Sequence, residues 1–253
     1  MNRKKRTKKC VLLSFLRDYI VPPSCPSCGE LLKIPRLVPL CADCCEEWEQ
    51  EKRGRCKDCG LTFYDCICLP PFLKEYGIRD GIFLSAYRSG RATVTDRLIY
   101  SVKRERDGAV FDFLAKELSK PVLDLLRAEE ISAEDVYVVP LPRRRRAVRE
   151  NGFDQAKLLA ASLTAALGCE YRELLLRRRD GREQKALNKE GRILNLEKAF
   201  RLKGVPDLSG KTILLVDDVM TTGSGIRAAA ELLKTCDAER IVPVTVARTV
   251  ASE

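Results

Sequence analysis

Cysteine pairs constrain this chain more than any other feature of its sequence. Nine of its twelve cysteines lie between Cys25 and Cys68, and most of them form Cys-x-x-Cys pairs. Two thiolates separated by two residues can bind one tetrahedral ion, and two such pairs joined by a loop complete a four-cysteine zinc site. The cysteines predicted to bind zinc are Cys25, Cys28, Cys41, Cys44, Cys56, Cys59, Cys66 and Cys68.

The sequence leaves the number of ions and the pairing of the cysteines open. Twelve residues separate Cys28 from Cys41, which suits one site made of the first two pairs. Cys66 and Cys68 are separated by one residue, a poorer geometry, and an interleaved pairing or a role for Cys45 fits the sequence too. Four thiolates leave no position for water, so we expect structural rather than catalytic zinc. Zinc would then supply the folding free energy of a segment too short to build its own core.

Other residues of this region support the same prediction. Gly29 and Gly60 each follow the second cysteine of a pair, where a knuckle turn needs a residue that tolerates positive φ. Cys169 and Cys236 stand alone beside apolar helical patterns and are predicted to be ordinary buried thiols.

The charge balance and the missing histidines narrow the chemistry. A net charge of +10 indicates either good solubility without a special partner or an affinity for phosphates, nucleic acids or anionic membrane surfaces, and charge alone does not choose among these. Because there is no histidine, no imidazole can act as an acid or a base or bind a metal. No apolar run approaches the length of a membrane span, so any membrane contact is predicted to be peripheral.

Residues 1–24 are predicted to form a basic leader and a short amphipathic helix. The segment has a basic head and an apolar middle, as a secretion signal does. However, Arg17 and Asp18 interrupt the apolar part, and no small-residue cleavage site follows.

From about Pro71 onward, apolar periodicity replaces the cysteine clusters. The pattern predicts buried strands over Val136–Pro142, Lys211–Val219 and Ile241–Ala247, and helices over Gln155–Leu167 and Gly225–Thr235. Gly168 is the predicted C-cap of the first helix. Strands that alternate with helices indicate an α/β fold with a parallel sheet, whose ligands bind at the carboxyl ends of the strands.

The stretch Ile213–Gly225, ILLVDDVMTTGSG, joins two carboxylates to a loop suited to an anion. The loop opens a helix, so its backbone N–H groups and the helix dipole favour a phosphate, and its hydroxyls add donors. The carboxylates can hold sugar hydroxyls or Mg²⁺. A phosphorylated ribose fits both parts, and the predicted site comprises Asp217, Asp218, Thr221, Thr222, Gly223, Ser224 and Gly225. The alternative, a plain strand end before an N-capped helix, does not need adjacent carboxylates.

An arginine run, Arg143–Arg149, follows the predicted strand 136–142 and therefore lies at the same ligand edge. The run indicates contact with an anion or a nucleic acid, and a solvated loop is the alternative. The loop Ser209–Thr212, SGKT, precedes a strand, whereas a Walker loop follows one, so the sequence argues against an ATPase.

ILLVDDVMTTGSG resembles the signature of type I phosphoribosyltransferases, which bind phosphoribosyl pyrophosphate (PRPP), except that Gly225 stands where Thr or Ser is frequent. A cysteine module followed by such a domain is similar to the ComF family. The segment 138–156 resembles a family segment that usually ends R-G-F-N-Q, with Asn151 and Asp154 in place of the Arg and the Asn. The ligand-edge candidates, partly marked by this resemblance, are Lys103, Arg143, Arg144, Arg145, Arg149, Gln184 and Arg192.

The resemblance implies a type I phosphoribosyltransferase-like parallel sheet flanked by helices over residues 71–253, preceded by a zinc module over residues 25–70. It implies a cytoplasmic protein of natural transformation that binds PRPP with Mg²⁺ and acts with a ComFA-like helicase on single-stranded DNA. Two alternatives stay open: an active phosphoribosyltransferase on a nucleobase or small metabolite, and a non-catalytic phosphate-sensing scaffold. The sequence shows no recognisable acceptor pocket, and only 6% of its residues are aromatic.

Overall fold

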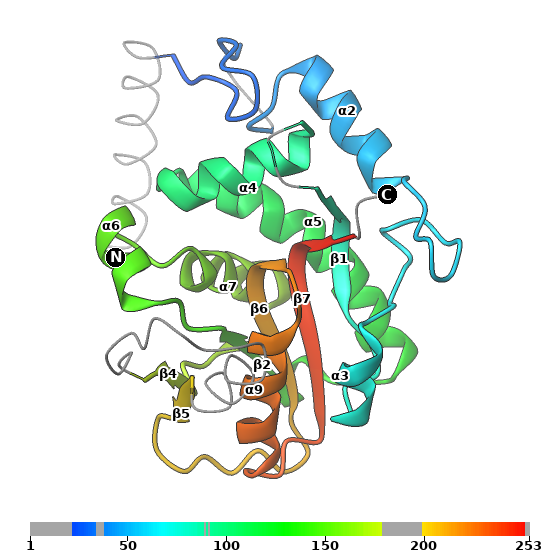
Figure 1. The fold of residues 1–253 in the computed structure, drawn as a ribbon, viewed down its shortest axis with the longest axis vertical. Helices are drawn as coiled ribbons and strands as arrows, with labels where there is room; N and C mark the ends of the chain where they lie inside the picture. The colour runs from blue at the N-terminus through cyan, green and yellow to red at the C-terminus, as the bar shows by residue number, and fades with distance from the viewer. Residues whose placement is uncertain (1–21, 34–37, 89, 91, 179–198, 251–253) are drawn as a thin grey trace, which may run out of the picture.

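The computed structural model describes residues 22–33, 38–88, 90, 92–178 and 199–250. A five-stranded sheet in the order β1-β7-β6-β2-β3 forms its centre, and every pairing in it is parallel. The strands span Ile82–Tyr87 (β1), Val136–Pro140 (β2), Glu170–Tyr171 (β3), Thr212–Met220 (β6) and Arg240–Thr249 (β7). Helices cover both faces of this sheet (Figure 1).

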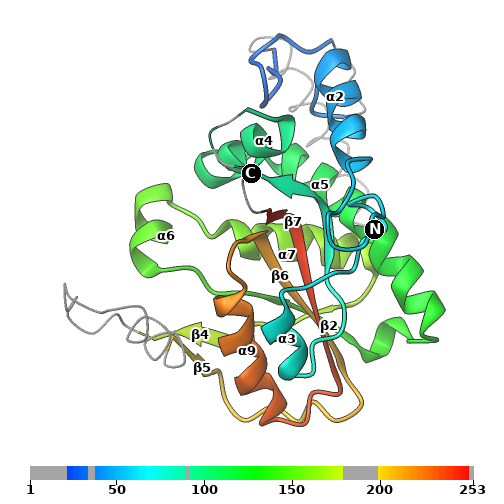
Figure 2. The ribbon, with the colours of Figure 1, turned by 45° about the vertical axis from the view of Figure 1, so that its right-hand side comes forward.

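Alternation along β6 distributes its side chains over two cores. Leu214 and Val216 belong to one buried cluster, and Ile213 and Leu215 belong to the other. The first face packs against α4 (Val94–Arg104), α5 (Gly108–Ala128) and α7 (Gln155–Leu167). The second face packs against α9 (Ser224–Lys234) and the short α3 (Pro71–Glu75), which lie side by side in Figure 2. The result is a three-layer α/β/α arrangement.

The cysteine-rich region lies against the first face and is not separate from it. Its helix α2 (Ala42–Lys52) buries Trp48 completely, within the same cluster as Leu84 of β1 and Leu118 of α5. A buried ion pair between Lys52 of α2 and Glu117 of α5 joins the two helices. The division of the chain near residue 70 into a zinc module and a second domain stays a prediction.

The remaining elements border the sheet. A 3-10 turn, η1 (Ala133–Asp135), leads into β2. The next helix after β2 is α6 (Arg145–Asn151). A small antiparallel pair is made by β4 (Leu175–Arg177) and β5 (Phe200–Leu202).

The predicted parallel sheet is confirmed, and the predicted strands and helices agree with the observed ones to within two residues at most ends. Gly168 ends α7 in the left-handed conformation with φ +70°, as the sequence predicts. The prediction of a basic leader helix concerns residues of which only 22–24 are described. Among the described residues, no helix has the length and apolarity needed to cross a bilayer.

Candidate functional site

Two adjacent carboxylates lie near the carboxyl end of β6. Alternation directs Asp217 toward the face covered by α9 and Asp218 toward the face covered by α7. Each accepts the backbone N–H of the following residue at 2.9 Å. Burial and the neighbouring Asp218 raise the pKa of Asp217 well above its ordinary value. Such a pair is unfavourable by itself, and a cation or hydrogen-bond donors would relieve it.

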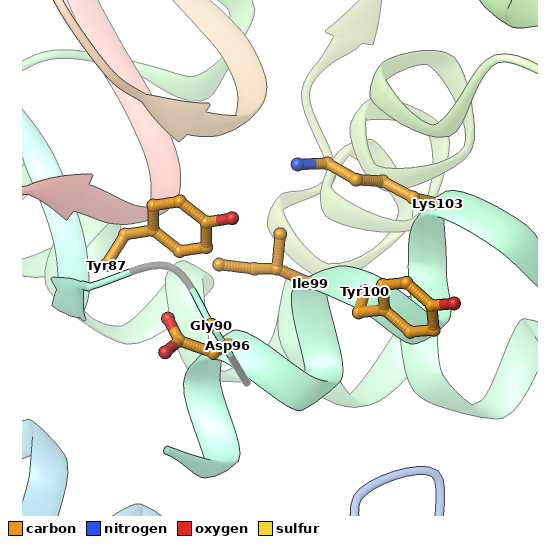
Figure 3. A pocket seen from close by; sticks show the side chains of 6 residues that line it. All are labelled: Tyr87, Gly90, Asp96, Ile99, Tyr100 and Lys103. Atoms are coloured by element: carbon orange, nitrogen blue, oxygen red, sulfur yellow. The ribbon is translucent and has the colours of Figure 1, made fainter. Parts of the chain in front are cut away.

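Asp218 has partners on two helices of the first layer. The Gln155 side-chain amide donates to Oδ2 of Asp218 at 3.1 Å, and Lys103 Nζ lies 3.5 Å from the same oxygen. Gln155 begins α7 and is fully buried, whereas Lys103 is in the last turn of α4. The Lys103 ammonium also lies 5.6 Å from the Tyr87 ring centroid, toward which it extends in Figure 3. The structure thus brings Lys103, one of the predicted ligand-edge residues, and Gln155 next to Asp218.

Two buried polar atoms near the carboxylates have no hydrogen-bond partners among the described residues. They are Gln155 Oε1 and Arg143 Nη1. The positive charge of Arg143 lowers the pKa of Asp217 and so partly offsets its burial. A polar ligand with both donors and acceptors, or a hydrated cation, fits this donor and acceptor set.

The loop between β6 and α9 has the form of an anion cradle. Thr221 and Thr222 are exposed, and the hydroxyls of Thr222 and Ser224 lie 2.8 Å apart. Gly223 is the N-cap of α9 with φ +73°, and a Cβ there would lie 3.1 Å from the Leu73 side chain. The N–H of Ser224, which opens α9, donates to the Thr222 hydroxyl over a long 3.5 Å, and the N–H groups that follow it in the first turn have no acceptor within the helix, as an anion site requires.

An arginine-lined cavity of about 910 Å³ opens after β2. The cationic side chains on its walls belong to Arg143, Arg145, Arg146, Arg149, Lys157 and Arg177. Arg144, in contrast, is the exposed N-cap residue of α6 and does not line the cavity. The arginine run therefore forms a shaped cationic surface rather than only a solvated loop.

The N-terminus of α7 explains one departure from the family pattern. Asp154 accepts the N–H groups of Ala156 and Lys157 at 3.1 and 3.4 Å. Asn and Asp cap helices about equally well, so Asp154 in place of Asn preserves this cap. Gln184 and Arg192, the remaining ligand-edge candidates, lie outside the described residues.

The cysteines form two clusters of four, in sequence order. The Sγ atoms within each cluster all lie within 4.8 Å of one another, and the clusters comprise Cys25, Cys28, Cys41 and Cys44, and Cys56, Cys59, Cys66 and Cys68. The interleaved pairing is therefore wrong for this structure, and Cys45 belongs to neither cluster.

The geometry of both clusters suits a metal such as zinc. The Sγ atoms of Cys28 and Cys41 are 3.6 Å apart, as are those of Cys59 and Cys66. In a tetrahedron with zinc–sulfur bonds of about 2.3 Å, the sulfurs are about 3.8 Å apart. Each cluster could thus bind one ion through four sulfurs, a closed coordination that leaves no catalytic position.

The same backbone turn begins each cluster. The N–H of Gly29 donates to the Cys25 carbonyl at 2.8 Å, and the N–H of Gly60 donates to the Cys56 carbonyl at 2.8 Å. Gly29 and Gly60 have φ of +83° and +74°, which confirms the predicted need for glycine. Cys236 is 6% exposed within the second core, which confirms the predicted buried thiol, whereas Cys169 is only half-buried against the first core, because it lies just past the end of α7.

Arg248 near the end of β7 connects the second cluster to the sheet. Its Nη2 donates to the Cys56 sulfur at 3.0 Å and to the Asp58 carboxylate at 2.9 Å. Its Nη1 donates to the Cys68 carbonyl at 2.9 Å, and its guanidinium lies 4.8 Å from the Phe83 ring centroid. Arg248 is only 8% exposed, so this cation offsets the negative charge that four thiolates bring to the cluster.

The first cluster is connected to the sheet through α4. The Glu51 carboxylate accepts the N–H groups of Val94 and Thr95 at 2.7 and 3.0 Å, and so caps the N-terminus of that helix. Arg97 of α4 donates to the Ser27 hydroxyl in the first knuckle at 2.7 Å. Because Lys103 lies in the last turn of α4, the cysteine region contacts the helix that carries a residue of the carboxylate site.

Comparison with known proteins agrees with this arrangement. Residues 147–253 match the model of the phosphoribosyl transferase domain. The chain is 34% identical over 224 residues to the DNA utilization protein YhgH of Escherichia coli (strain K12), which covers 80% of this chain and 92% of the relative. The chain belongs to the ComF/YhgH family.

Other similarities to this ComF/YhgH chain are more distant. It is 28% identical over 212 residues to the competence protein ComFC of Streptococcus pneumoniae, with 83% of this chain and 87% of the relative covered. The crystal structure of a purine phosphoribosyltransferase from Pyrococcus horikoshii Ot3 shares 17% identity at a TM-score of 0.33, over 54% of this chain and 83% of that one. A structural similarity with a TM-score this low supports no argument about function.

Sequence reasoning missed two residues of these sites. Gln155 lies in the segment that resembles the ComF family, but nothing in its residue type or spacing marks it as a site residue, so it is not among the candidates. Arg248 has no sequence signal at all, because it lies 192 positions from the sulfur it contacts. Long-range contacts of this kind become visible only when the strand order is known.

Proposed function

We propose that this ComF/YhgH protein binds PRPP together with Mg²⁺ at the carboxyl edge of its sheet and acts in the uptake and handling of single-stranded DNA. One observation carries the ligand: the pair Asp217–Asp218 lies shortly before the N-terminus of α9, where the N-cap residue is Gly223, which has no side chain to accept the first N–H groups of the helix. A phosphate monoester and a diol on one molecule match these two features.

The groups of PRPP can be assigned by charge. The 5-phosphate belongs at Thr221–Gly225, where N–H groups and hydroxyls converge. The ribose hydroxyls, or the Mg²⁺ ion, belong at the two aspartates, which would repel a bare phosphate. The pyrophosphate belongs toward Arg143 and the arginine-lined cavity. When bound, Mg²⁺ would neutralise the pyrophosphate charge.

The cysteine clusters support a structural role for the metal. Both lie away from the carboxylates in the chain but pack on the sheet that carries them, and both could close around an ion with four sulfurs. We therefore assign zinc to the stability of the fold and not to chemistry.

The cellular role rests on the relatives. Their names refer to DNA utilization and to competence, and a cytoplasmic protein of this kind would meet single-stranded DNA as it enters, beside a ComFA-like helicase. The charge of +10 suits that encounter, because DNA is a polyanion.

Calorimetry with PRPP and with inorganic phosphate tests the ligand assignment. Asp217→Ala and Asp218→Ala should weaken PRPP binding while leaving phosphate binding nearly unchanged, because only the sugar or its cation meets the carboxylates. Thr222→Ala should weaken both ligands by about 1.5–3 kcal/mol, the typical contribution of a charge-assisted hydrogen bond.

Metal content and melting temperature serve as controls for these variants, since the cysteine clusters and the fold should be preserved. If both aspartate variants bind PRPP as tightly as the parent, the PRPP assignment is wrong. The carboxylates would then contact a partner protein, and the alternative function of a non-catalytic scaffold would be favoured.

A second candidate function, direct binding of single-stranded DNA, is favoured by the arginine-lined cavity. Arg145 and Arg149 are exposed on its wall. Replacing both by Gln should weaken DNA binding uniformly across sequences and lower the salt slope by about 1 for each arginine that binds a phosphate. Arg127→Gln, at an exposed arginine of α5 paired with Asp124, is the matched control. Binding that stays constant between low and moderate salt would contradict an electrostatic contact.

A further inference from the structure

Two cavities flank the carboxylate pair, one on each side along the sheet. The order β1-β7-β6-β2 places the arginine-lined cavity after β2, on one side of β6. On the other side, beyond β7, a smaller cavity of about 220 Å³ lies between the end of β1 and α4. Its walls include Tyr87, Asp96, Ile99 and Lys103, and we refer to it as the Tyr87 cavity.

The Tyr87 cavity differs in chemistry from the arginine-lined one. Figure 3 shows the Tyr87 ring, the Ile99 side chain and the Lys103 ammonium directed toward one space, while the Tyr100 ring points away. Tyr87 is half-buried and Ile99 is buried, and together they give the cavity an aromatic and an aliphatic wall beside the charged groups of Asp96 and Lys103. Such walls suit the face of a flat, uncharged ring and not a polyphosphate.

Lys103 links this cavity to the proposed PRPP site. Its Nζ lies 3.5 Å from Asp218 Oδ2 and 5.6 Å from the Tyr87 ring centroid. One side chain thus borders both the carboxylate pair and the cavity, so a ring in the cavity would lie next to a sugar held by the aspartates.

Asp96 adds a polar preference. Its side chain is buried, with 2% of the residue exposed, and one carboxylate oxygen accepts the N–H of Arg88 at 3.1 Å. The other oxygen has no hydrogen-bond partner among the residues that the structure describes. A buried carboxylate oxygen without a donor is costly, and an N–H group on an occupant could supply that donor.

Resting on the proposed function, we propose that the Tyr87 cavity binds the acceptor of a phosphoribosyl transfer, a neutral nitrogen heterocycle of nucleobase size that carries N–H groups. In a displacement at C1 of the ribose, the acceptor and the leaving group occupy opposite sides of that carbon. The two cavities lie on opposite sides of the aspartates that would hold the ribose. The arginine-lined cavity suits pyrophosphate, and the Tyr87 cavity, with one cation, one carboxylate and an aromatic wall, suits a neutral acceptor.

The step balances without any further reactant. The acceptor nitrogen donates its lone pair to C1 of PRPP, and the C1–O bond to pyrophosphate breaks with its electron pair. The acceptor N–H proton passes to the departing pyrophosphate. The products are a ribonucleoside 5-monophosphate and pyrophosphate.

The size of the cavity limits the acceptor. Pockets for drug-sized ligands measure about 300–1,000 Å³, so a cavity of about 220 Å³ suits a single heterocycle and excludes a nucleotide. The acceptor is therefore a free base rather than a base within DNA.

The test combines PRPP–Mg²⁺ with adenine, guanine, hypoxanthine, xanthine, uracil or cytosine, and measures pyrophosphate release and the binding of each base in the presence of PRPP. We expect at least one base to release pyrophosphate. Tyr87→Ala, which removes a wall, and Ile99→Phe, which fills the space, should each lower that rate about tenfold or more while PRPP affinity changes less than about twofold. Tyr171→Ala, at a half-buried tyrosine on the opposite edge strand β3, is the matched control and should retain the parent rate.

The outcomes separate this proposal from the one it rests on. If PRPP binds the parent but none of the six bases binds or releases pyrophosphate, the acceptor site is wrong and the PRPP site stands. Equal rates for the parent and for a folded Tyr87→Ala or Ile99→Phe variant also overturn the acceptor site. If PRPP itself does not bind, both proposals fail.

Discussion

The cysteine region and the carboxylate edge obey opposite physical rules. In residues 25–68, the groups that would bind an ion are closed around it, and their charge is offset by Arg248. At Asp217–Gly225, two carboxylates are adjacent and the N-cap residue of α9 is a glycine, while the buried atoms without partners in the described chain belong to the neighbouring Gln155 and Arg143. The sulfurs of the first region lie close enough together to share an ion, whereas the carboxylates of the second region lie beside these atoms, Gln155 Oε1 and Arg143 Nη1.

This difference indicates where the molecule gains stability and where it gives stability up. Groups that lack partners in the free protein lower its stability, but they are available to a ligand. Disrupting the cysteine region should therefore destabilise the protein, and neutralising the carboxylate edge should stabilise it while weakening binding. The opposite signs of these effects make the comparison testable.

Removal of metal should have the largest effect. Structural zinc in four-ligand modules contributes on the order of 10 kcal/mol, which is comparable with the whole stability of a typical domain of about 5–15 kcal/mol. We expect about two equivalents of zinc by elemental analysis, and loss of the cooperative melting transition when a strong chelator removes them. Cys169→Ser, which replaces a thiol outside both clusters, should change neither metal content nor the response to chelator.

Reduced, undamaged protein that folds with less than half an equivalent of metal would contradict the assignment of these clusters. One equivalent would instead show that only one of them is a metal site. The comparison between the two regions would then apply to that cluster alone.

Arg248→Met should come next in size. The substitution removes the buried cation from the Cys56 sulfur, whereas the Asp58 side chain is 65% exposed and would be rehydrated, so we expect a cost of about 1.5–3 kcal/mol. For a chain of this length we expect the melting temperature to fall by about 3–10 °C. Arg127→Met, at an exposed arginine, should leave the melting temperature within about 2 °C of the parent. A parental melting temperature for Arg248→Met would show that the guanidinium contributes nothing to the second cluster.

The extent to which the sequence predicts these two regions follows from the range of the interactions. The first cysteine cluster and β6 with its loop depend on contacts close in sequence, and spacing and periodicity predict both. The sequence leaves the pairing of the second cluster open because Cys66 and Cys68 are too close for the usual turn. Arg248, Gln155 and the Tyr87 cavity depend on strand order and helix packing, which bring together residues far apart in the chain.

Asp217→Asn should stabilise the free protein. Burial and Asp218 raise the pKa of Asp217 in the folded state, so the folded protein binds a proton more tightly than the unfolded one between the ordinary carboxyl pKa and the raised value. Stability therefore falls as pH rises through that window. At pH 7 the variant should be more stable than the parent, and the gain should shrink as the pH falls toward 4.

Thermal melts of the parent and of Asp217→Asn between pH 4 and pH 8 measure this difference. The same variant should bind PRPP more weakly, so that stability and affinity move in opposite directions. A variant that is less stable than the parent at pH 7 would break the contrast between the two regions.

Gly225→Ser should have the smallest effect. The new hydroxyl would restore the donor that related loops carry, and a Cβ at this position meets Leu141 at an ordinary contact distance of 3.4 Å. A net gain of about 0.5–1.5 kcal/mol for one hydrogen bond corresponds to about two- to tenfold tighter phosphate binding. Gly223→Ser is the contrasting control, because its φ of +73° and the nearby α3 side chains forbid a Cβ. Calorimetry with inorganic phosphate measures both, and weaker binding by Gly225→Ser would argue against a phosphate at this loop.

A crystal structure of the complex with PRPP and Mg²⁺ tests the central claim most directly. The account predicts the 5-phosphate within about 2.7–3.2 Å of the backbone nitrogens that open α9, with the ribose hydroxyls or the Mg²⁺ ion on Asp217 and Asp218. The pyrophosphate should lie on the side of Arg143, and C1 of the ribose should face the Tyr87 cavity. A PRPP molecule bound elsewhere, or a complex in which the two aspartates contact neither sugar nor cation, would contradict it.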